Sequence, residues 1–419
     1  MIRWLFSKTV RDASAMHKQV YRMVCAQRDL MTQAAFVLVS DALANLRKAL
    51  HDKEPVGKIR EKMWTCEEVA NKWLKPYPHP IWRENIEVLL VAIAVAMAIR
   101  TFFLQPFKIP TGSMQPTLFG VNSDNLMVDK KVEIPSGWQR VNDWFHGISY
   151  IHVVARADGP LQEVSSPVKF LIFNLMQTVV IGGVRQTIWF PPDYGEAPTD
   201  INGYTMEPLM YRAGLVLGTP YHKGDDVVKL EVKAGDHLFV DRVSYNFRKP
   251  ARGDIVVFET KGIPEEMRHN PPYWNIPDDE FYIKRLVGLG GETITLNQDY
   301  VVTNAPGGGD VPVGNLVVNG KDLNASTPHF ENLYSFDNPD TGAKIIGYHG
   351  DGYYGHAMLQ KLAPGQEVQI RPNYLFVMGD NTMNSLDSRY WGDFPEQSII
   401  GKSFFVYWPL SSRFGWGTQ

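Results

Sequence analysis

The chain has 419 residues, of which 44% are hydrophobic and 21% charged, and its formal net charge is −3. This length and composition allow two or three domains with sizeable cores, and they exclude a disordered or fibrous protein. The charge is uneven, because residues 1–83 carry 15 Lys and Arg against eight Asp and Glu, whereas residues 84–419 carry 27 against 37. The sequence contains no dense Lys/Arg tract or zinc-finger spacing, so we expect no nucleic-acid binding.

The basic segment, residues 1–83, is predicted to be α-helical. Apolar residues recur at helical spacing through residues 9–75, and no proline interrupts them before Pro55. We expect a helical hairpin that packs on itself, with partner binding as the alternative. Both cysteines of the chain, Cys25 and Cys66, lie here, which excludes a disulfide in the remainder and suits a reducing, cytosolic compartment.

Residues 84–105 are predicted to form one transmembrane helix. The uncharged run from Val88 to Ile99 is too short to cross a bilayer, which requires roughly 20 residues. Extending this run to Leu104 adds only one charged residue, Arg100, whose guanidinium can reach the interface. The basic residues on the N-terminal side favour a cytosolic N-terminus. A buried core helix is the alternative. A cleavable signal peptide is not expected, because Met1–Thr9 lacks an apolar core.

Ser113 lies in a rigid segment just beyond this helix. Pro110 and Pro116 restrict the backbone on both sides of it, and Gly112 permits a close approach of the chain. Such a turn can hold one hydroxyl in a fixed direction, which is typical of a nucleophile. A simple connecting loop has the same composition, so an activating group elsewhere in the chain is needed to decide.

After Leu118 the pattern becomes that of β-strands. Short apolar runs are bounded by Gly, Pro, Asp or Asn, and they include Val168–Met176, Val179–Ile181, His237–Val240 and Ile255–Phe258. The sequence therefore predicts a mainly β fold, with sheets or a barrel.

Lys284 interrupts one of these apolar runs, Phe281–Leu289. Alternation along a strand places Lys284 on the face opposite Ile283 and Arg285. If that face is inward, burial must lower the pKa of the lysine, and a neutral lysine can take a proton from a serine hydroxyl. An exposed charge at a sheet edge is the alternative.

A dense polar loop follows the apolar run Tyr374–Met378. Asp387 and Arg389 are spaced for a local ion pair, and Ser385 can hydrogen-bond a buried amine. A purely structural polar loop remains the alternative.

Together and in this order, these segments resemble the type I signal peptidases, which are membrane-bound serine proteases with a Ser/Lys dyad. The resemblance covers Ile86–Gly120, Ala234–Phe258, Phe281–Ile294 and Pro372–Pro409. It implies a signal-peptidase-like β-barrel or sheet as the catalytic core, with inserted β-rich regions. This core is preceded in the chain by one transmembrane helix and the α-helical N-terminal segment.

The resemblance also implies roles for particular residues. Ser113 matches the nucleophile, Lys284 the general base, and Thr111 the hydroxyl that forms the oxyanion hole with the Ser113 amide. Ser385 matches the serine that orients the lysine. The remaining matches are expected to support the site or to lie near substrate or membrane, and they are Asp380, Asp387, Arg389, Arg285, Met114 and Pro116.

The implied activity is removal of N-terminal signal peptides from exported preproteins after small residues in an Ala-x-Ala-like pattern. It requires no histidine, metal or cofactor. The implied partners are preproteins, the lipid bilayer and the protein-export machinery. The implied location is the cytoplasmic membrane, crossed once, with the catalytic part outside the cytoplasm.

Two departures from the family pattern shape the predicted domains. Thr382 and Met383 follow Gly-Asp-Asn, where the family usually has an arginine. A long interval, residues 121–233, separates the nucleophile segment from the next matching strand. We therefore predict the following order: 1–83 cytosolic helices, 84–105 span, 106–120 nucleophile segment, 121–233 inserted β-rich domain, 234–296 core with the base, 297–371 second β-rich insertion or cap, and 372–419 the rest of the core.

Two other function classes fit parts of this pattern. A non-catalytic membrane-tethered β adaptor derived from a peptidase would not need Ser113 and Lys284. A Ser/Lys self-cleaving protease of the same broad fold would need a DNA-binding head in place of the span. A Ser-His-Asp hydrolase is not expected, because no Gly-x-Ser-x-Gly elbow occurs.

Overall fold

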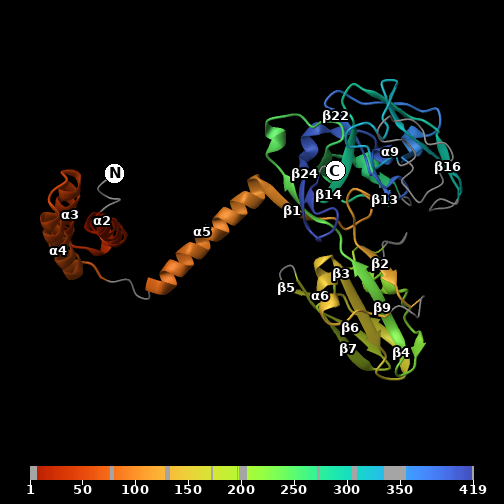
Figure 1. Ribbon diagram of the computed structural model, residues 1–419. Helices are drawn as coiled ribbons and strands as arrows, with labels where there is room; N and C mark the ends of the chain where they lie inside the picture. The colour runs from red at the N-terminus through yellow and green to blue at the C-terminus, as the bar shows by residue number, and fades with distance from the viewer. Residues whose placement is uncertain are drawn as a thin grey trace. The chain divides into compact units, whose positions relative to one another are not determined.

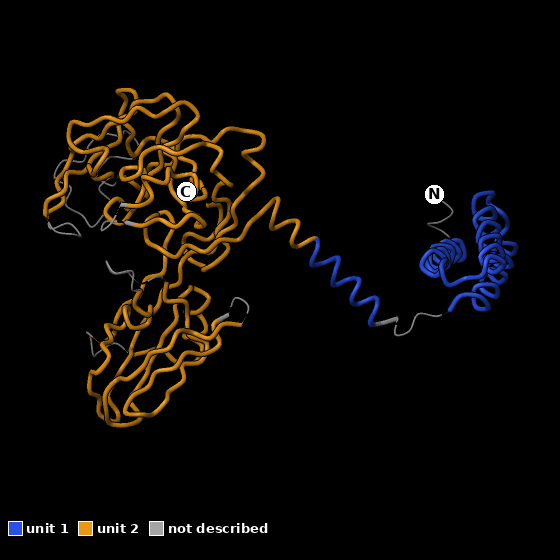
Figure 2. The backbone as a smooth tube through the Cα atoms, turned by 180° about the vertical axis from the view of Figure 1, so that it is seen from behind, with its two compact units in different colours: residues 1–94 blue, residues 95–419 orange. Residues whose placement is uncertain are grey.

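The computed structural model describes residues 7–75, 80–127, 133–170, 173–195, 197, 205–270, 274–303, 309–334 and 355–417. The chain divides into two compact units, residues 1–94 and 95–419 (Figure 2). The division falls within helix α5 (Pro80–Phe102).

Among the described residues of the first unit, three long helices and one short 3₁₀ turn precede α5, where the sequence predicted a hairpin. They are α2 (Lys8–Gln27), η1 (Arg28–Leu30), α3 (Gln33–His51) and α4 (Val56–Trp73). The hairpin prediction was wrong because two breaks occur: the Thr32 hydroxyl caps α3 by accepting from Ala35 N at 3.3 Å, and Pro55 precedes α4. Buried side chains from all three helices, among them Val24, Val39 and Ile59, form one apolar core.

Helix α5 holds the one candidate membrane span found in the described residues. Trp82–Phe102 is 21 residues long with a mean hydropathy of 1.9, and none of its apolar window is buried within the protein. The helix ends before the predicted residue 105 because strand pairing takes over: Phe103 O accepts from Arg242 N at 3.0 Å, and Leu104 begins strand β1.

An antiparallel sheet of eight strands lies directly after α5 (Figure 1). Its order is β1-β10-β24-β11-β14-β22-β23, with β25 beside β24. The strands are β1 (Leu104–Lys108), β10 (His237–Asp241), β24 (Ile399–Trp408), β11 (Ile255–Glu259), β14 (Phe281–Gly288), β22 (Tyr374–Met378), β23 (Phe394–Pro395) and β25 (Gly415–Trp416). Apolar side chains lie on both faces: Val257 and Val406 belong to one buried cluster, and Val256 and Val377 to another.

The interval 121–233 folds around its own core, which includes Leu161, Val179 and Leu230. One sheet has the order β2-β9-β3, and the other has the order β5-β6-β4-β8 with β7 beside β6. The elements are β2 (Asn122–Asn125), α6 (Trp138–Phe145), β3 (Ile148–Val154), β4 (Gly159–Val164), β5 (Val168–Phe170), β6 (Phe173–Ile181), β7 (Val184–Trp189), α7 (Pro208–Ala213), β8 (Pro220–Tyr221) and β9 (Asp226–Lys233). The apolar run Val168–Met176 contains parts of two paired strands, β5 and β6, with Val168 opposite Met176.

The described part of residues 297–371 adds two small sheets, β19-β18-β15-β21 and β16-β17-β20. Their strands are β15 (Thr293–Leu296), β16 (Tyr300–Val302), β17 (Val311–Gly314), β18 (Leu316–Val318), β19 (Lys321–Asp322), β20 (His356–Ala357) and β21 (Val368–Gln369). A core that includes Ile294, Leu316 and Phe376 joins them to β22.

The short elements of the second unit connect these sheets. They are η2 (Ser244–Asn246), η3 (Thr260–Gly262), α8 (Glu265–Arg268), β12 (His269–Asn270), β13 (Trp274–Asn275), η4 (Gln360–Leu362), η5 (Thr382–Asn384), α9 (Ser388–Trp391) and η6 (Glu396–Ser398).

Candidate active site

Ser113 and Lys284 meet although 171 positions separate them in the sequence. The Lys284 amine lies 2.7 Å from Ser113 Oγ, and both residues are buried. Ser113 comes from the turn after β1, and Lys284 from β14. Folding therefore brings the predicted nucleophile and the predicted base within direct proton-transfer distance.

The loop after β22 holds the serine turn in place. Asn381 N donates to Ser113 O, and Asn381 Nδ2 donates to Gly112 O, both at 3.0 Å. Gly379 must lack a side chain, since a Cβ there would lie 2.5 Å from Ser113 O and 2.2 Å from Ser385 Oγ. Asn381 did not appear among the predicted site residues, although it belongs to the Gly-Asp-Asn element.

Lys284 lies in the interior of the sheet, opposite Val256 of β11. Burial of the amine lowers its pKa to about 8, although the Asp387 and Asp380 carboxylates act in the opposite direction. A substantial fraction of the lysine is therefore neutral near neutral and mildly alkaline pH, and a neutral amine can accept a proton.

Arg285 points to the other face of β14 and is also buried, because both faces of this sheet are covered. It forms a two-pronged ion pair with Asp380, with Nε to Oδ1 at 2.8 Å and Nη2 to Oδ2 at 2.6 Å. Thr117 completes the group: its hydroxyl donates to Asp380 Oδ2 at 2.5 Å and accepts from Arg285 Nη2 at 3.1 Å. Thr117, four residues after the serine, was not among the predicted site residues.

Asp387 and Arg389 form the ion pair that their spacing predicted. Arg389 donates to Asp387 through Nε at 2.9 Å and Nη2 at 2.7 Å, and both side chains are fully buried. Burial alone would raise the pKa of Asp387, but the Arg389 charge holds it below its usual value. Thr382, where the family usually has arginine, accepts from Arg389 Nη1 at 2.7 Å through its hydroxyl. The threonine is thus part of this network.

Ser385 and Thr111 both line the cleft beside the dyad. No hydrogen bond joins Ser385 to Lys284 in the part of the chain that the structure describes, so the predicted contact with the amine is not observed. The Ser385 hydroxyl is buried and makes no hydrogen bond among the described residues. Thr111 is exposed next to Ser113, and the Ser113 amide donates to no other group among the described residues.

Met114 and Pro116, expected near substrate or membrane, take other positions. The Met114 side chain is completely buried in the core with Leu118 and Leu238, so it cannot contact substrate or lipid. Pro116 is half-buried and is not among the described residues that line the cleft.

The cleft has a volume of about 870 Å³ and lies between two strand edges. Strand β1 is at the end of the eight-stranded sheet. On the other side, Phe281–Lys284 of β14 pairs with β11, and pairing with β22 begins only at Arg285 in the described residues. Phe107 and Phe281 make an edge-to-face contact at 5.5 Å between these strands. The cleft thus offers unpaired backbone groups to an extended peptide.

Comparison with known proteins identifies a related family. A family model described as "Signal peptidase, peptidase S26" matches residues 82–145 and 214–408. Signal peptidase I of Leptolyngbya laminosa is 30% identical over 180 residues, 43% of this chain and 64% of that protein. Probable signal peptidase I-2 of Synechocystis sp. is 27% identical over 184 residues, 43% of this chain and 58% of that protein.

A third relative, signal peptidase I of Aquifex aeolicus, is 30% identical over 201 residues, 42% of this chain and 69% of that protein. The chain spans less than two thirds of the length of the two cyanobacterial relatives. The family match leaves out residues 146–213, which are most of the interval predicted as an inserted domain.

Proposed function

This chain belongs to the signal peptidase family, peptidase S26, and we propose that it is a membrane-bound serine endopeptidase that removes signal peptides from exported preproteins. Ser113 is the nucleophile and Lys284 the general base. The observation that carries this proposal is the 2.7 Å contact between Lys284 Nζ and Ser113 Oγ in a buried site. A buried lysine beside a serine, without an acidic partner bonded to the amine among the described residues, is suited to accept a proton.

The first step is acylation. Neutral Lys284 takes the Ser113 proton while Oγ attacks the scissile carbonyl, and the protonated lysine then donates to the leaving amine. In the second step the same lysine activates a water that hydrolyses the ester. The pKa of about 8 makes the lysine able to serve as base and acid in turn.

The oxyanion that forms during attack needs donors beside Ser113. The Ser113 amide and the Thr111 hydroxyl are the candidates, since both are next to the nucleophile and neither bonds elsewhere among the described residues. One such donor typically contributes roughly 3 kcal/mol to the transition state.

The substrate lies as an extended strand between β1 and the first half of β14. Small residues at the first and third positions before the cut suit the side chains that point toward the closely packed core beneath β1, where Ile109 and Leu238 lie. Helix α5 crosses the bilayer once, with the basic N-terminal unit in the cytosol, and so keeps the cleft near membrane-embedded signal peptides. The export machinery would deliver these preproteins.

The test is cleavage of a preprotein by the full-length protein in detergent micelles. We expect Ser113→Ala and Lys284→Met each to lower kcat/KM by roughly 10⁴-fold or more, because removing one member disables the pair. Lys261→Met, at an exposed lysine outside the cleft, is the matched control. Cleavage retained by either dyad variant would overturn the proposed roles, and no cleavage by the wild type would favour the adaptor. Protease protection of residues 106–419 in sealed vesicles tests the orientation separately.

A further inference from the structure

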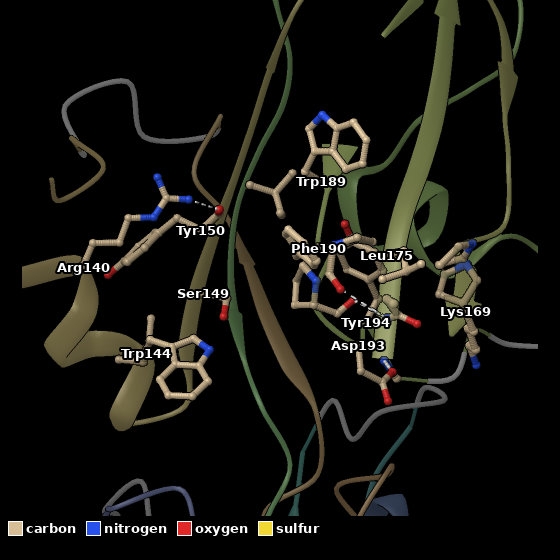
Figure 3. A pocket seen from close by; sticks show the side chains of 18 of the residues that line it. Arg140, Trp144, Ser149, Tyr150, Lys169, Leu175, Trp189, Phe190, Asp193 and Tyr194 are labelled. Carbon is tan, nitrogen blue, oxygen red and sulfur yellow. Dashed lines mark hydrogen bonds between the residues drawn. The ribbon is translucent and has the colours of Figure 1, made fainter. Parts of the chain in front are cut away.

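The interval 121–233 contains a groove that the proposed reaction does not use. Its volume is about 1180 Å³. One wall comes from α6 and β3, with Arg140, Trp144 and Tyr150, and the other from β5 to β7 and the turn after them, with Trp189, Phe190 and further residues (Figure 3). Most of this second wall lies in residues 146–213, outside the family match.

Large aromatic side chains of the groove remain exposed. Trp144 is 55% exposed, Trp189 66% and Phe190 71%, although the domain already buries a separate apolar core. Phe190 also has a φ of 49°, a left-handed conformation that is strained for a bulky residue. Trp144 contacts Trp408, and Trp189 contacts Phe190. More than half of each of these three groove side chains stays exposed all the same, and such exposed apolar surface is typical of a recognition site.

The groove and the cleft share one lining residue, Lys108, which is the last residue of β1. Lys108 forms an ion pair with Asp193 from the second wall. The same turn is fastened at two more points, because Arg212 donates to Tyr194 O at 3.0 Å and to Val121 O at 3.3 Å. The groove is therefore held against the strand that leads to Ser113.

The two faces of β1 border different parts of the protein. Phe107 and Ile109 pack toward the apolar core, whereas Lys108 points to the opposite face, where the groove begins. A peptide that extends along the free edge of β1 has the same alternation. If every second side chain of that peptide faces the core side of the sheet, the peptide side chains between them face the groove.

The direction of the peptide follows from the proposed function, on which this inference rests. The signal peptide precedes the scissile bond and starts in the membrane, and α5 precedes β1 in the chain. The part of the preprotein before the cut therefore runs along β1 from α5 toward Ser113. Residues after the cut leave on the other side of Ser113 and do not pass Lys108.

We propose that this groove is a substrate subsite that receives a bulky aromatic or apolar side chain of the preprotein, at the second or fourth position before the cut. Trp189 and Phe190 would contact that side chain, while the Lys108–Asp193 pair fixes the groove relative to the cleft. The enzyme would then select small residues at alternate positions through the core and a large residue between them through the inserted domain.

The first test compares two preprotein peptides that differ only by Trp or Ala at the second position before the cut, with a second pair for the fourth position. In the full-length protein with W189A and F190A combined, we expect the ratio of kcat/KM for the Trp and Ala peptides to fall roughly tenfold in one pair. F247A, which removes an 85% exposed phenylalanine that lines neither cavity, should leave both ratios unchanged.

A second measurement does not depend on turnover or on the folding of the double variant. In the full-length Ser113→Ala protein, peptides with a photoreactive benzoylphenylalanine at those positions should crosslink to residues 189–194 or to Trp144. Unchanged ratios, or crosslinks only to the cleft beyond Ser113, would overturn the subsite. Crosslinks to the groove without cleavage by the wild type would instead contradict the proposed reaction.

Discussion

The cleft beside Ser113 and Lys284 and the aromatic groove share the lining residue Lys108 but are built in opposite ways. In the cleft the charged groups are buried and paired, as Arg285 with Asp380 and Arg389 with Asp387. In the groove the aromatic rings are exposed, and the Lys108–Asp193 pair is partly open to solvent. The difference matches the two proposed tasks: proton transfer needs an amine whose pKa is lowered by burial, whereas recognition needs accessible apolar surface.

The largest difference between the two regions should appear in the free energy of unfolding when one aspartate is removed from each. Asp380→Ala leaves Arg285 buried without its partner, which should lower the free energy of unfolding by about 3–5 kcal/mol. Asp193→Ala breaks a partly exposed pair and should cost only about 0–1 kcal/mol. Urea denaturation of both full-length variants in the same detergent measures the two values. Similar losses for the two variants would mean that burial does not distinguish the regions.

The pH dependence of cleavage should follow the protonation of a group in the cleft, Lys284, and not that of a group in the groove. Lys284 must be neutral to act as base, and its pKa of about 8 means that it is mostly protonated at lower pH. We expect kcat/KM to rise about tenfold per pH unit below pH 8 and to level off above it. His237, which lines the groove, has a pKa lowered to about 4 by burial and by Lys108, so it stays neutral over this range. A profile that is flat between pH 6 and pH 8 would contradict the lysine base.

A smaller effect should show whether the buried Thr382 hydroxyl stabilises the network by its hydrogen bond or only by the packing of its side chain. Thr382→Val keeps the shape of the side chain but leaves Arg389 Nη1 without its 2.7 Å acceptor, so the protein should lose about 1–3 kcal/mol of stability. Thr382→Ser retains the hydroxyl and is the matched control. Thermal unfolding of both variants provides the comparison, and equal shifts in Tm would show that the hydroxyl is not needed.

Several features of the site were accessible from sequence patterns because they are local. The Pro-Thr-Gly-Ser turn, the apolar run that became α5 and the spacing of Asp387 and Arg389 each depend on residues close in the chain. Predictions that depended on tertiary packing were less successful. In place of the predicted N-terminal hairpin, the described residues form three helices, and Met114, which was expected near substrate or membrane, lies in the core.

Thr117 and Asn381 show why part of the site was missed. Thr117 gains its role from Arg285 and Asp380, which lie 168 and 263 positions away, and Asn381 gains its role from the Ser113 turn. Neither residue carries a local pattern that marks it. A hydroxyl or an amide becomes part of a site only through the partner that folding places against it.

The sequence alone determined which residue types were available for the chemistry and which segments alternate or coil, since these depend on neighbouring residues and backbone geometry. Only the tertiary structure decided that Lys284 lies 2.7 Å from Ser113, that burial lowers the lysine pKa, and that Lys108 lines both the groove and the cleft. The physical reason is that burial and long-range contacts arise from the packing of distant segments. A periodic pattern states which face of a strand is apolar, but not what lies against it.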